Sequence, residues 1–370
     1  RPAGRSLRVF LFKLERVESM QETRRFKAII LGAAGMTGGE LLRILAKHNY
    51  ISVIAAISKS KKNTPVGATH PHLRSYFAGM TFVSYEEAHI DEANIAFVAL
   101  PHGSSANEVA KLLEKGLKVV DLSADFRLKD PENYKEWYNI EHPRPELLQQ
   151  SVYGLPELHR DDIASTNLIS GVGCNATASI LALLPLARAG LIESVHLDIR
   201  AGSSEAGAMP SGGSHHPFRS RATRIVEPFC HRHLAEVSQE LGLPLEKLSM
   251  RLSTIEAVRG VQACADVTLN TKISERELWK IYRSTYVGEP FVELCPARPS
   301  YLRFPDPKLV CGSNKALVGF ALNEEGNRCL AVSAIDNLMK GAAGSAVQSA
   351  NIMLGISEIE GLDMQPVYPV

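Results

Sequence analysis

Short apolar runs alternate with stretches of helical spacing over the first third of the chain. The apolar runs, each of a length typical of a buried strand, lie at 26–31, 51–57, 95–100 and 118–122. Helices are expected between them, over 39–46 and 107–114. The first run ends in a glycine-rich turn directly before the first of these helices. Strand, glycine turn, helix and strand form the unit of a doubly wound parallel sheet, so the sequence predicts an α/β fold with a Rossmann-type nucleotide domain.

The glycine-rich turn is the first chemical signal. Glycines at 32, 35 and 38 let the backbone approach a pyrophosphate, which would sit at the N-terminus of the following helix. The spacing differs from the usual G-x-G-x-x-G, but the position between a strand and a helix favours a cofactor site over a purely structural turn. The residues of the turn expected to bind the cofactor are Gly32, Ala34, Gly35, Met36, Thr37 and Gly38.

The end of the second strand indicates which dinucleotide binds. An NAD site would place Asp or Glu there to hold the ribose hydroxyls, whereas this chain has only hydroxyls and cations over 58–62. That composition favours a 2′-phosphate, so the sequence predicts NADPH/NADP, held by Ser58, Lys59 and Ser60. A solvated basic turn is the alternative.

Overall charge argues against nucleic acids and membranes as partners, and cysteine usage indicates the cellular compartment. The formal net charge is +1, which gives no general attraction to nucleic acids or membranes. The six cysteines are scattered without a C-x-x-C pair, a pattern typical of reduced thiols in the cytoplasm. A cytoplasmic protein of 370 residues with room for two domains is expected.

Cys174 is the candidate nucleophile. It follows Gly171-Val172-Gly173 and precedes the apolar stretch 179–184. This pattern predicts a glycine loop followed by a buried helix. Free amides and the positive end of the helix dipole stabilise a thiolate at such a place. The alternative is a small buried cysteine that only fills the start of the helix.

Histidines further along the chain could serve this thiol. His231 and His233 lie in a His-Arg-His run, and a histidine of near-neutral pKa is the usual proton partner of a cysteine. A zinc site made of His215, His216, these two histidines and Cys230 is the alternative. Because neither C-x-x-C nor H-E-x-x-H spacing occurs, the sequence predicts no metal.

A dinucleotide fold, a cysteine at a helix start and a histidine together indicate one chemistry. The thiolate attacks an acyl carbon to give a thioester, and hydride from the nicotinamide leads to an aldehyde. The alternative from another class is an NADP-binding sensor that kept the fold and lost the chemistry. Such a sensor would need a defect in the site, and the sequence shows none.

Several motifs resemble those of the N-acetyl-γ-glutamyl-phosphate reductase family, which is similar in architecture to aspartate-semialdehyde dehydrogenases. The resemblance runs from about residue 26 to the C-terminus, and its motifs lie at 32–43, 99–103, 121–127, 153–157, 231–233 and 336–344. It implies NADPH-dependent reduction of N-acetyl-γ-glutamyl phosphate to its semialdehyde, with release of phosphate, in arginine biosynthesis.

The resemblance also implies roles for single residues. Cys174 would be the nucleophile and His231 the general acid/base, although His233 could take that part. Asn337 would reach the nicotinamide end of the cofactor. Arg127 would pair with a substrate carboxylate or phosphate, or form a structural ion pair instead. The residues expected around the substrate are Asn175, Ser204, His233, Glu236 and Arg127.

Two departures from the common family pattern bear on the substrate. Asn175 replaces the usual tyrosine after the cysteine, and Glu256-Ala257-Val258 replaces an expected proline before Arg259. Both are similar to a branch whose substrate amine is attached to a small acidic carrier protein, with α-aminoadipyl phosphate of lysine biosynthesis as the alternative substrate. A basic patch would attract such a carrier, unless it is an ordinary solvated loop. The patch consists of Arg219, Arg221 and Arg224.

The expected domain organisation follows from these elements and the resemblance. Residues 1–25 would be an N-terminal extension outside the fold. Residues 26–173 and 336–370 would form the dinucleotide-binding domain. Residues 174–335 would form an α+β catalytic domain on an antiparallel sheet, with strands near 195–200, 263–269 and 317–322. The resemblance implies a homo-oligomer, a dimer or tetramer, that associates through this domain.

Overall fold

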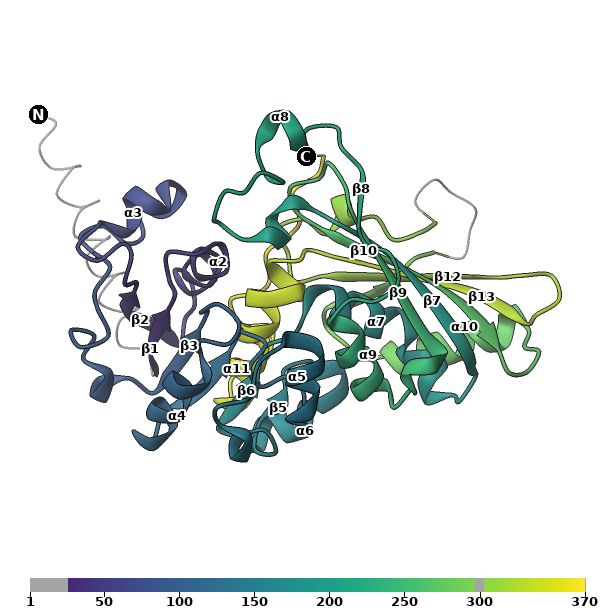
Figure 1. The fold of residues 1–370 in the computed structure, drawn as a ribbon, viewed down its shortest axis with the longest axis horizontal. Coiled ribbons are helices and arrows are strands. Elements are labelled where there is room, and N and C mark those ends of the chain that lie inside the picture. The colour runs from purple at the N-terminus through teal and green to yellow at the C-terminus, as the bar shows by residue number, and fades with distance from the viewer. Residues whose placement is uncertain (1–25, 297–302, 370) are drawn as a thin grey trace, which may run out of the picture.

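The computed structural model describes residues 26–296 and 303–369, which form two sheets with helices packed on them (Figure 1). The expected N-terminal extension, residues 1–25, lies outside the described residues. None of the helices in the described ranges is both long and apolar enough to cross a membrane.

The first sheet is the predicted parallel one. Its six strands lie in the order β2-β1-β3-β4-β6-β5, and every neighbouring pair is parallel. The strands are β1 (Phe26–Leu31), β2 (Ile51–Ile57), β3 (Ile95–Val98), β4 (Lys118–Asp121), β5 (Val152–Tyr153) and β6 (Leu168–Ser170). The strand order reverses between β1 and β3, and ligands of such sheets bind at this switch point, beyond the carboxyl ends of the strands.

Helices flank the first sheet. They are α2 (Met36–Leu45), α3 (Val66–Thr69), α4 (Ala106–Glu114), α5 (Glu132–Tyr138), α6 (Pro156–Ser165) and α11 (Gly344–Met353). The helix expected over 39–46 starts three residues earlier, at the end of the glycine turn. This confirms the Rossmann-type arrangement of strand, turn and helix.

The second sheet has seven strands in the order β11-β12-β13-β10-β7-β9-β8. They are β7 (Ile192–Ala201), β8 (Arg224–Glu227), β9 (Leu248–Thr254), β10 (Val261–Leu269), β11 (Val292–Leu294), β12 (Ala316–Leu322) and β13 (Arg328–Ile335). The three strands predicted here exist and extend beyond the predicted ranges. The sheet is mixed rather than antiparallel as expected, because β7 pairs with β9 and β11 with β12 in parallel. The long chain between β7 and β9, which includes α9 (His233–Leu241), allows the crossover that a parallel pair needs.

The core of the second sheet lies against the helix that starts at Cys174. This helix, α7 (Cys174–Arg188), is buried along most of its length because its residues are apolar on every side. Its Ile180 and Leu183 share a core with Leu197 of β7 and Tyr282 of α10 (Glu275–Tyr286). Figure 1 shows α7, α9 and α10 on the same side of the strands. A short exposed helix, α8 (His216–Arg219), projects from the opposite side.

The C-terminal part of the chain returns to the first sheet. After β13 a π-helical turn at Met339–Ala343 leads into α11. Lys340 in this turn is fully buried, with Nζ 2.6 Å from Glu157 Oε1 of α6 and 2.8 Å from Gln348 Oε1. The boundaries at 173/174 and 335/336 remain our proposal for the division into domains.

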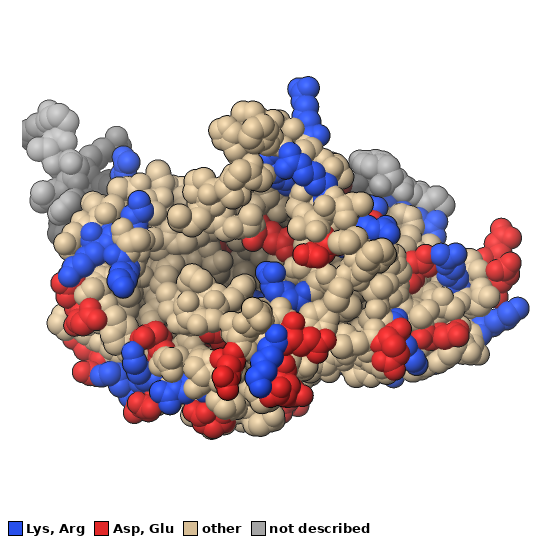
Figure 2. Space-filling model, viewed as in Figure 1, with Lys and Arg blue, Asp and Glu red and all other residues tan. Residues whose placement is uncertain are grey.

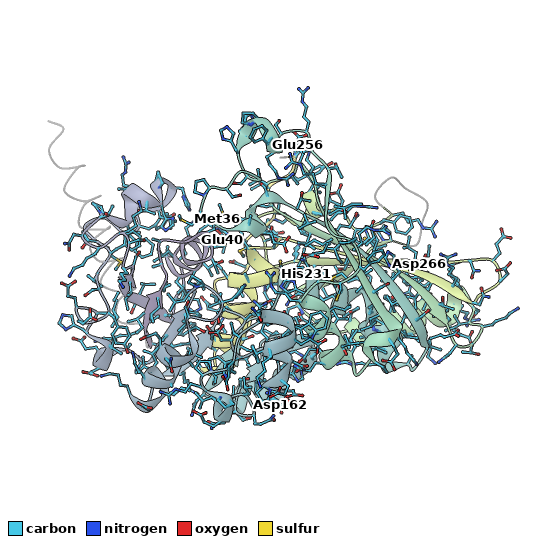
Figure 3. The ribbon with its side chains drawn as sticks, in the orientation of Figure 1. Met36, Glu40, Asp162, His231, Glu256 and Asp266 are labelled. Atoms are coloured by element: carbon cyan, nitrogen blue, oxygen red, sulfur yellow. The ribbon has the colours of Figure 1, made fainter. Side chains whose placement is uncertain are left out.

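Charged side chains link the glycine-turn helix to the second sheet. Arg259, just before β10, places Nη2 2.6 Å from Glu40 Oε1 of α2 and 3.1 Å from Asp336 Oδ1. Figure 2 shows a hollow on this face between the two parts of the molecule, with charged groups at its edge. Figure 3 marks Met36 and Glu40 on α2, with His231 between this helix and the second sheet. The link fixes the candidate phosphate-binding turn relative to that sheet.

Candidate active site

Cys174 lies at the same edge of the first sheet as the glycine turn. It follows β6 after only three residues, and the carboxyl ends of parallel strands meet at one edge. Two glycines allow close approaches here. A Cβ atom on Gly173 would lie 2.6 Å from Glu236 Oε1, and one on Gly341 would lie 2.6 Å from the Cβ of Cys174. Side chains at either position would therefore displace the thiol or its supports.

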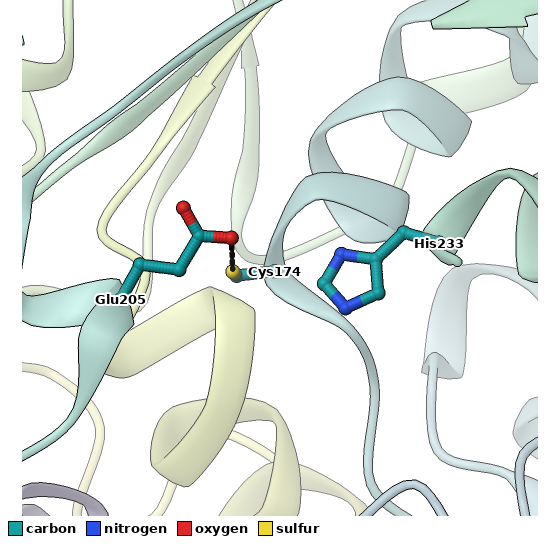
Figure 4. Close-up of side chains that lie close together, drawn as sticks. All are labelled: Cys174, Glu205 and His233. Carbon is teal, nitrogen blue, oxygen red and sulfur yellow. Dashed lines mark hydrogen bonds between the residues drawn. The ribbon is translucent and has the colours of Figure 1, made fainter. Parts of the chain in front are cut away.

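The thiol of Cys174 lies between a carboxylate and an imidazole (Figure 4). Its Sγ atom is 3.7 Å from Glu205 Oε1 and 3.8 Å from Asn175 Oδ1, so it can donate a hydrogen bond to either. His233 reaches the site from the other side. The thiol sulfur, a carboxylate oxygen of Glu205 and a ring nitrogen of His233 all lie within 4.8 Å of one another.

Burial keeps this thiol protonated in the free site. Burial raises the pKa of Cys174 well above its usual value, and the nearby Glu205 carboxylate raises it further. Arg127 and the backbone at Asn175 act in the opposite direction but have smaller effects. Burial thus opposes the stabilisation of a thiolate expected at the helix N-terminus, which stays a prediction. A proton acceptor beside the sulfur is needed.

The two histidines of the His-Arg-His run are both buried and both neutral. Burial lowers the pKa of His231 to about 3, and it lowers the pKa of His233 well below its usual value. His231 Nδ1 accepts a hydrogen bond of 3.2 Å from the backbone N–H of His233, and the rings meet edge to face. Of the two, His233 is the one that belongs to the described cluster with Cys174 and Glu205. His231 instead lines a pocket together with Trp137, Cys230 and Arg232.

Arg127 and Glu236 form a buried ion pair, with Arg127 Nη1 3.0 Å from Glu236 Oε1. Arg127 also donates to the carbonyl oxygens of Gly171 and Val172, and Glu236 Oε2 accepts from the backbone N–H of Gly173. The structural ion pair given as the alternative role of Arg127 is therefore present. The expected contacts of both residues with the substrate stay predictions. The pair holds the loop that leads into Cys174.

The other expected substrate residues lie around the thiol. Asn175 is fully buried, and its Nδ2 donates a hydrogen bond of 2.6 Å to Glu205 Oε1. Ser204 lies beside Glu205 in a 3₁₀ turn, Ser203–Ala206. Asn337 donates to Ser204 Oγ at 2.9 Å and accepts from the backbone N–H of Gly260 at 2.8 Å. Its side chain therefore braces this turn, and its expected contact with nicotinamide stays a prediction.

The glycine turn has the shape that a dinucleotide needs. Gly32 has a φ of 79°, and a Cβ there would lie 2.2 Å from the carbonyl oxygen of Ala99. A Cβ at Gly35 would meet only Gly32 O, at 3.5 Å, so this side of the turn is open. Helix α2 starts at Met36 without a side-chain cap, which leaves its first amides for a phosphate. Beyond β2, Ser58 is buried, whereas Lys59 and Ser60 are exposed.

Glu205 belongs to the run 203–207, which the resemblance places near the acyl phosphate, but its direct contact with the thiol was not expected. Its signal is that it is the single acidic residue in the run Gly202–Gly207. Both departures from the family pattern, Asn175 and residues 256–258, contact Glu205 or the turn that carries it. Asn175 binds its carboxylate, while the carbonyl oxygens of Ala257 and Val258 accept from the backbone N–H groups of Ser203 and Ser204, each at 2.9 Å.

Comparison with protein-family models matches both parts of the chain. Residues 27–166 match the NAD binding domain of semialdehyde dehydrogenases, and residues 174–337 match the dimerisation domain of semialdehyde dehydrogenases.

Curated relatives match nearly the whole chain. A LysW-L-2-aminoadipate/LysW-L-glutamate phosphate reductase of Sulfurisphaera tokodaii is 46% identical over 349 residues, which cover 93% of this chain and 99% of the relative. The protein of the same name from Saccharolobus solfataricus is 45% identical, with 93% and 99% covered.

Solved structures share the fold. Aspartate semialdehyde dehydrogenase II from Vibrio cholerae has a TM-score of 0.67 at 17% identity, over 90% of this chain and 99% of the other. Aspartate semialdehyde dehydrogenase with NADP from Candida albicans has a TM-score of 0.65 at 17% identity, over 89% and 98%. The two-domain α/β architecture expected from the sequence is confirmed.

Proposed function

Because this chain belongs to the semialdehyde dehydrogenase family, we propose that it uses Cys174 to reduce an acyl phosphate bound to a carrier protein, with NADPH as hydride donor. The products are an aldehyde on the carrier and inorganic phosphate. The observation that carries this proposal is the thiol of Cys174 between Glu205 and His233, at the edge of the sheet where the glycine turn lies.

In the proposed reaction, His233 takes the proton of the Cys174 thiol, because its imidazole is neutral and close to the sulfur. The thiolate attacks the acyl carbon, and the bond between that carbon and the phosphate oxygen breaks. His233 returns its proton to the departing phosphate, which leaves a thioester on Cys174. NADPH, when bound at the glycine turn, would supply the hydride that reduces this thioester carbon. The C–S bond then breaks, which releases the aldehyde and the thiolate.

The residues of the glycine turn fit the cofactor. An uncapped helix N-terminus and an open side at Gly35 support pyrophosphate binding at residues 32–38. Ser58, Lys59 and Ser60 follow β2 in the place where an acid would favour NAD, and they support binding of a 2′-phosphate.

We infer that His233 is the residue that transfers the proton and that His231 positions it, which reverses the order expected from the sequence. His233→Asn should lower kcat by roughly 10²–10⁴-fold, whereas His231→Asn should have a smaller effect because it removes only an acceptor for the His233 backbone. Steady-state rates at saturating substrate test this. His196→Asn, a half-buried histidine in β7, is the control. A larger loss in His231→Asn than in His233→Asn would restore the original order.

The proposed substrate is a carrier-bound aminoadipyl or glutamyl phosphate rather than the N-acetyl compound. The names of the curated relatives favour this alternative over the expected arginine-pathway substrate. The departures at Asn175 and 256–258 support the same substrate, because both resemble the carrier-dependent branch. Aminoadipate would place the enzyme in lysine biosynthesis.

The docking surface proposed for the carrier surrounds α8. Arg221 and Arg224 are exposed there, and Phe218 and Phe229 are exposed apolar side chains nearby in the chain. Val258 is 68% exposed, and its own carbonyl holds the turn that carries Glu205. A carrier attracted by the cations and anchored on the apolar side chains would reach the surface next to the site.

The carrier-bound substrate should give a higher kcat/KM than the free N-acetyl compound, and this advantage should shrink as salt rises. Exchanging Arg221 and Arg224 for glutamate should lower kcat/KM for the carrier-bound substrate by about tenfold, because the changes reverse the steering charge. Turnover of the free compound should not change. Lys115→Glu, at the exposed C-cap of α4 where Lys115 pairs with Asp91, is the control for a charge reversal outside the patch. Equal or better turnover of the free compound would contradict carrier recognition.

We further propose that the chain works as a homo-oligomer in the cytoplasm. Residues 174–337 match a domain described as a dimerisation domain, which supports association through the second sheet. All six cysteines are free thiols, which supports a reducing compartment.

A further inference from the structure

The cluster at the thiol has the composition of a metal site. Cys174, Glu205 and His233 offer a sulfur, an oxygen and a nitrogen, and these three atoms lie within 4.8 Å of one another. We propose that Zn²⁺ binds to these three side chains and inhibits the enzyme reversibly. The inhibitory role rests on the proposed function of Cys174, whereas the binding site itself rests on the geometry alone.

The spacing of two ligand atoms already suits zinc. In a tetrahedral site with bonds of about 2.3 Å to sulfur and about 2.1 Å to oxygen, the two ligand atoms are about 3.6 Å apart. Cys174 Sγ and Glu205 Oε1 are 3.7 Å apart. Asn175 Nδ2 donates to the same oxygen and keeps the carboxylate in place, as outer hydrogen bonds do in metal sites.

His233 supplies an independent sign of a ligand. The residue is 4% exposed, and its Nδ1 atom has no hydrogen-bond partner among the residues that the structure describes. Its Nε2 faces Arg127 Nη1 at 3.5 Å. A buried ring nitrogen without a partner is costly, and a rotation of the ring toward the thiol would satisfy it with a metal ion.

Binding of Zn²⁺ would block catalysis, because the metal would occupy the sulfur lone pair that attacks the acyl carbon. Three protein ligands would leave a fourth position to water. The sequence shows no metal motif, since the ligands come from positions 174, 205 and 233 on three separate elements. Only the fold brings them together.

The test uses Co²⁺ as a spectroscopic probe, followed by Zn²⁺ as a competitor, on the full chain without substrate. One equivalent of Co²⁺ should give a thiolate-to-cobalt charge-transfer band and the intense visible bands of a tetrahedral site, and Zn²⁺ should bleach both. Cys174→Ser should abolish the charge-transfer band. Glu205→Gln and His233→Asn should weaken binding by about tenfold or more. Cys230→Ser, which removes an exposed thiol, should leave the spectrum unchanged.

The proposed metal site would be refuted if the charge-transfer band is absent from the unaltered protein or persists in Cys174→Ser. In turnover assays, Zn²⁺ should inhibit at the concentration at which it bleaches cobalt, and EDTA should restore the rate. Activity that requires zinc would overturn the inhibitory role. Tetrahedral cobalt binding in a protein with no acyl-phosphate reductase activity would leave the site intact and refute the proposed function instead.

Discussion

Replacing Cys174 with serine is expected to lower the kcat of acyl-phosphate reduction by about a thousandfold or more, which corresponds to about 4 kcal/mol of activation free energy. The serine hydroxyl keeps the size of the side chain but is a far weaker nucleophile than a thiolate, so no thioester forms. Rates of NADPH oxidation with purified acyl phosphate measure the effect.

The control for this experiment is Cys230→Ser, because Cys230 is an exposed free thiol outside the cluster. It should keep full activity. Cofactor affinity, followed by NADPH fluorescence, should be unchanged in both variants, since the glycine turn is on a different element. Undiminished turnover in Cys174→Ser would refute the covalent mechanism. Cofactor binding without any turnover in the unaltered protein would favour the sensor considered from the sequence.

Replacing Lys340 with methionine is expected to lower the free energy of unfolding by about 3–5 kcal/mol. Lys340 and Glu157 are both fully buried, and their charged atoms are 2.6 Å apart. Methionine fills similar space but leaves the Glu157 carboxylate buried without its partner. The pair also joins the turn after β13 to α6, so its loss should loosen the attachment of the C-terminal segment. Urea unfolding followed by circular dichroism measures the change.

Two further variants show whether the lost charge is the cause. Lys340→Met combined with Glu157→Leu should recover most of the stability, because replacing both partners removes the buried charge. Lys115→Ala breaks an exposed ion pair with Asp91 and should change stability by less than about 1 kcal/mol. If Lys340→Met alone costs no more than Lys115→Ala, the buried pair does not stabilise the fold as inferred.

The first sheet could be predicted from the sequence because its signals are local. Each parallel strand is a short apolar run. The turn after β1 is recognisable by its glycines, because Gly32 has a φ of 79° and approaches Ala99 closely. The second sheet was predicted only in part. The alternation along β7 and β10 identifies strands but carries no information about partners, so the parallel pairing of β7 with β9 could not be seen.

The candidate site could likewise be predicted only where the signal is local. Cys174 was found because a glycine loop before an apolar helix is a local pattern. Arg127 and Glu236 are 109 residues apart, and whether they face a substrate or each other depends on burial that only the fold determines. His231 and His233 are two positions apart, and the turn at the start of α9 decides which one approaches the thiol. Glu205 lies in a run that the resemblance places near the acyl phosphate, but its contact with the sulfur depends on the fold.

The return of the C-terminal segment to the first sheet has a consequence for synthesis of the protein. Met339, Val347 and Ala350 share one apolar core with Ile30 and Val120. A growing chain that has just completed β6 therefore lacks the helix that covers this face. At about 5–20 residues per second, roughly 10–40 s pass before α11 has been made. During that interval the exposed apolar face can attract chaperones or other nascent chains, so its protection depends on completing the last helix.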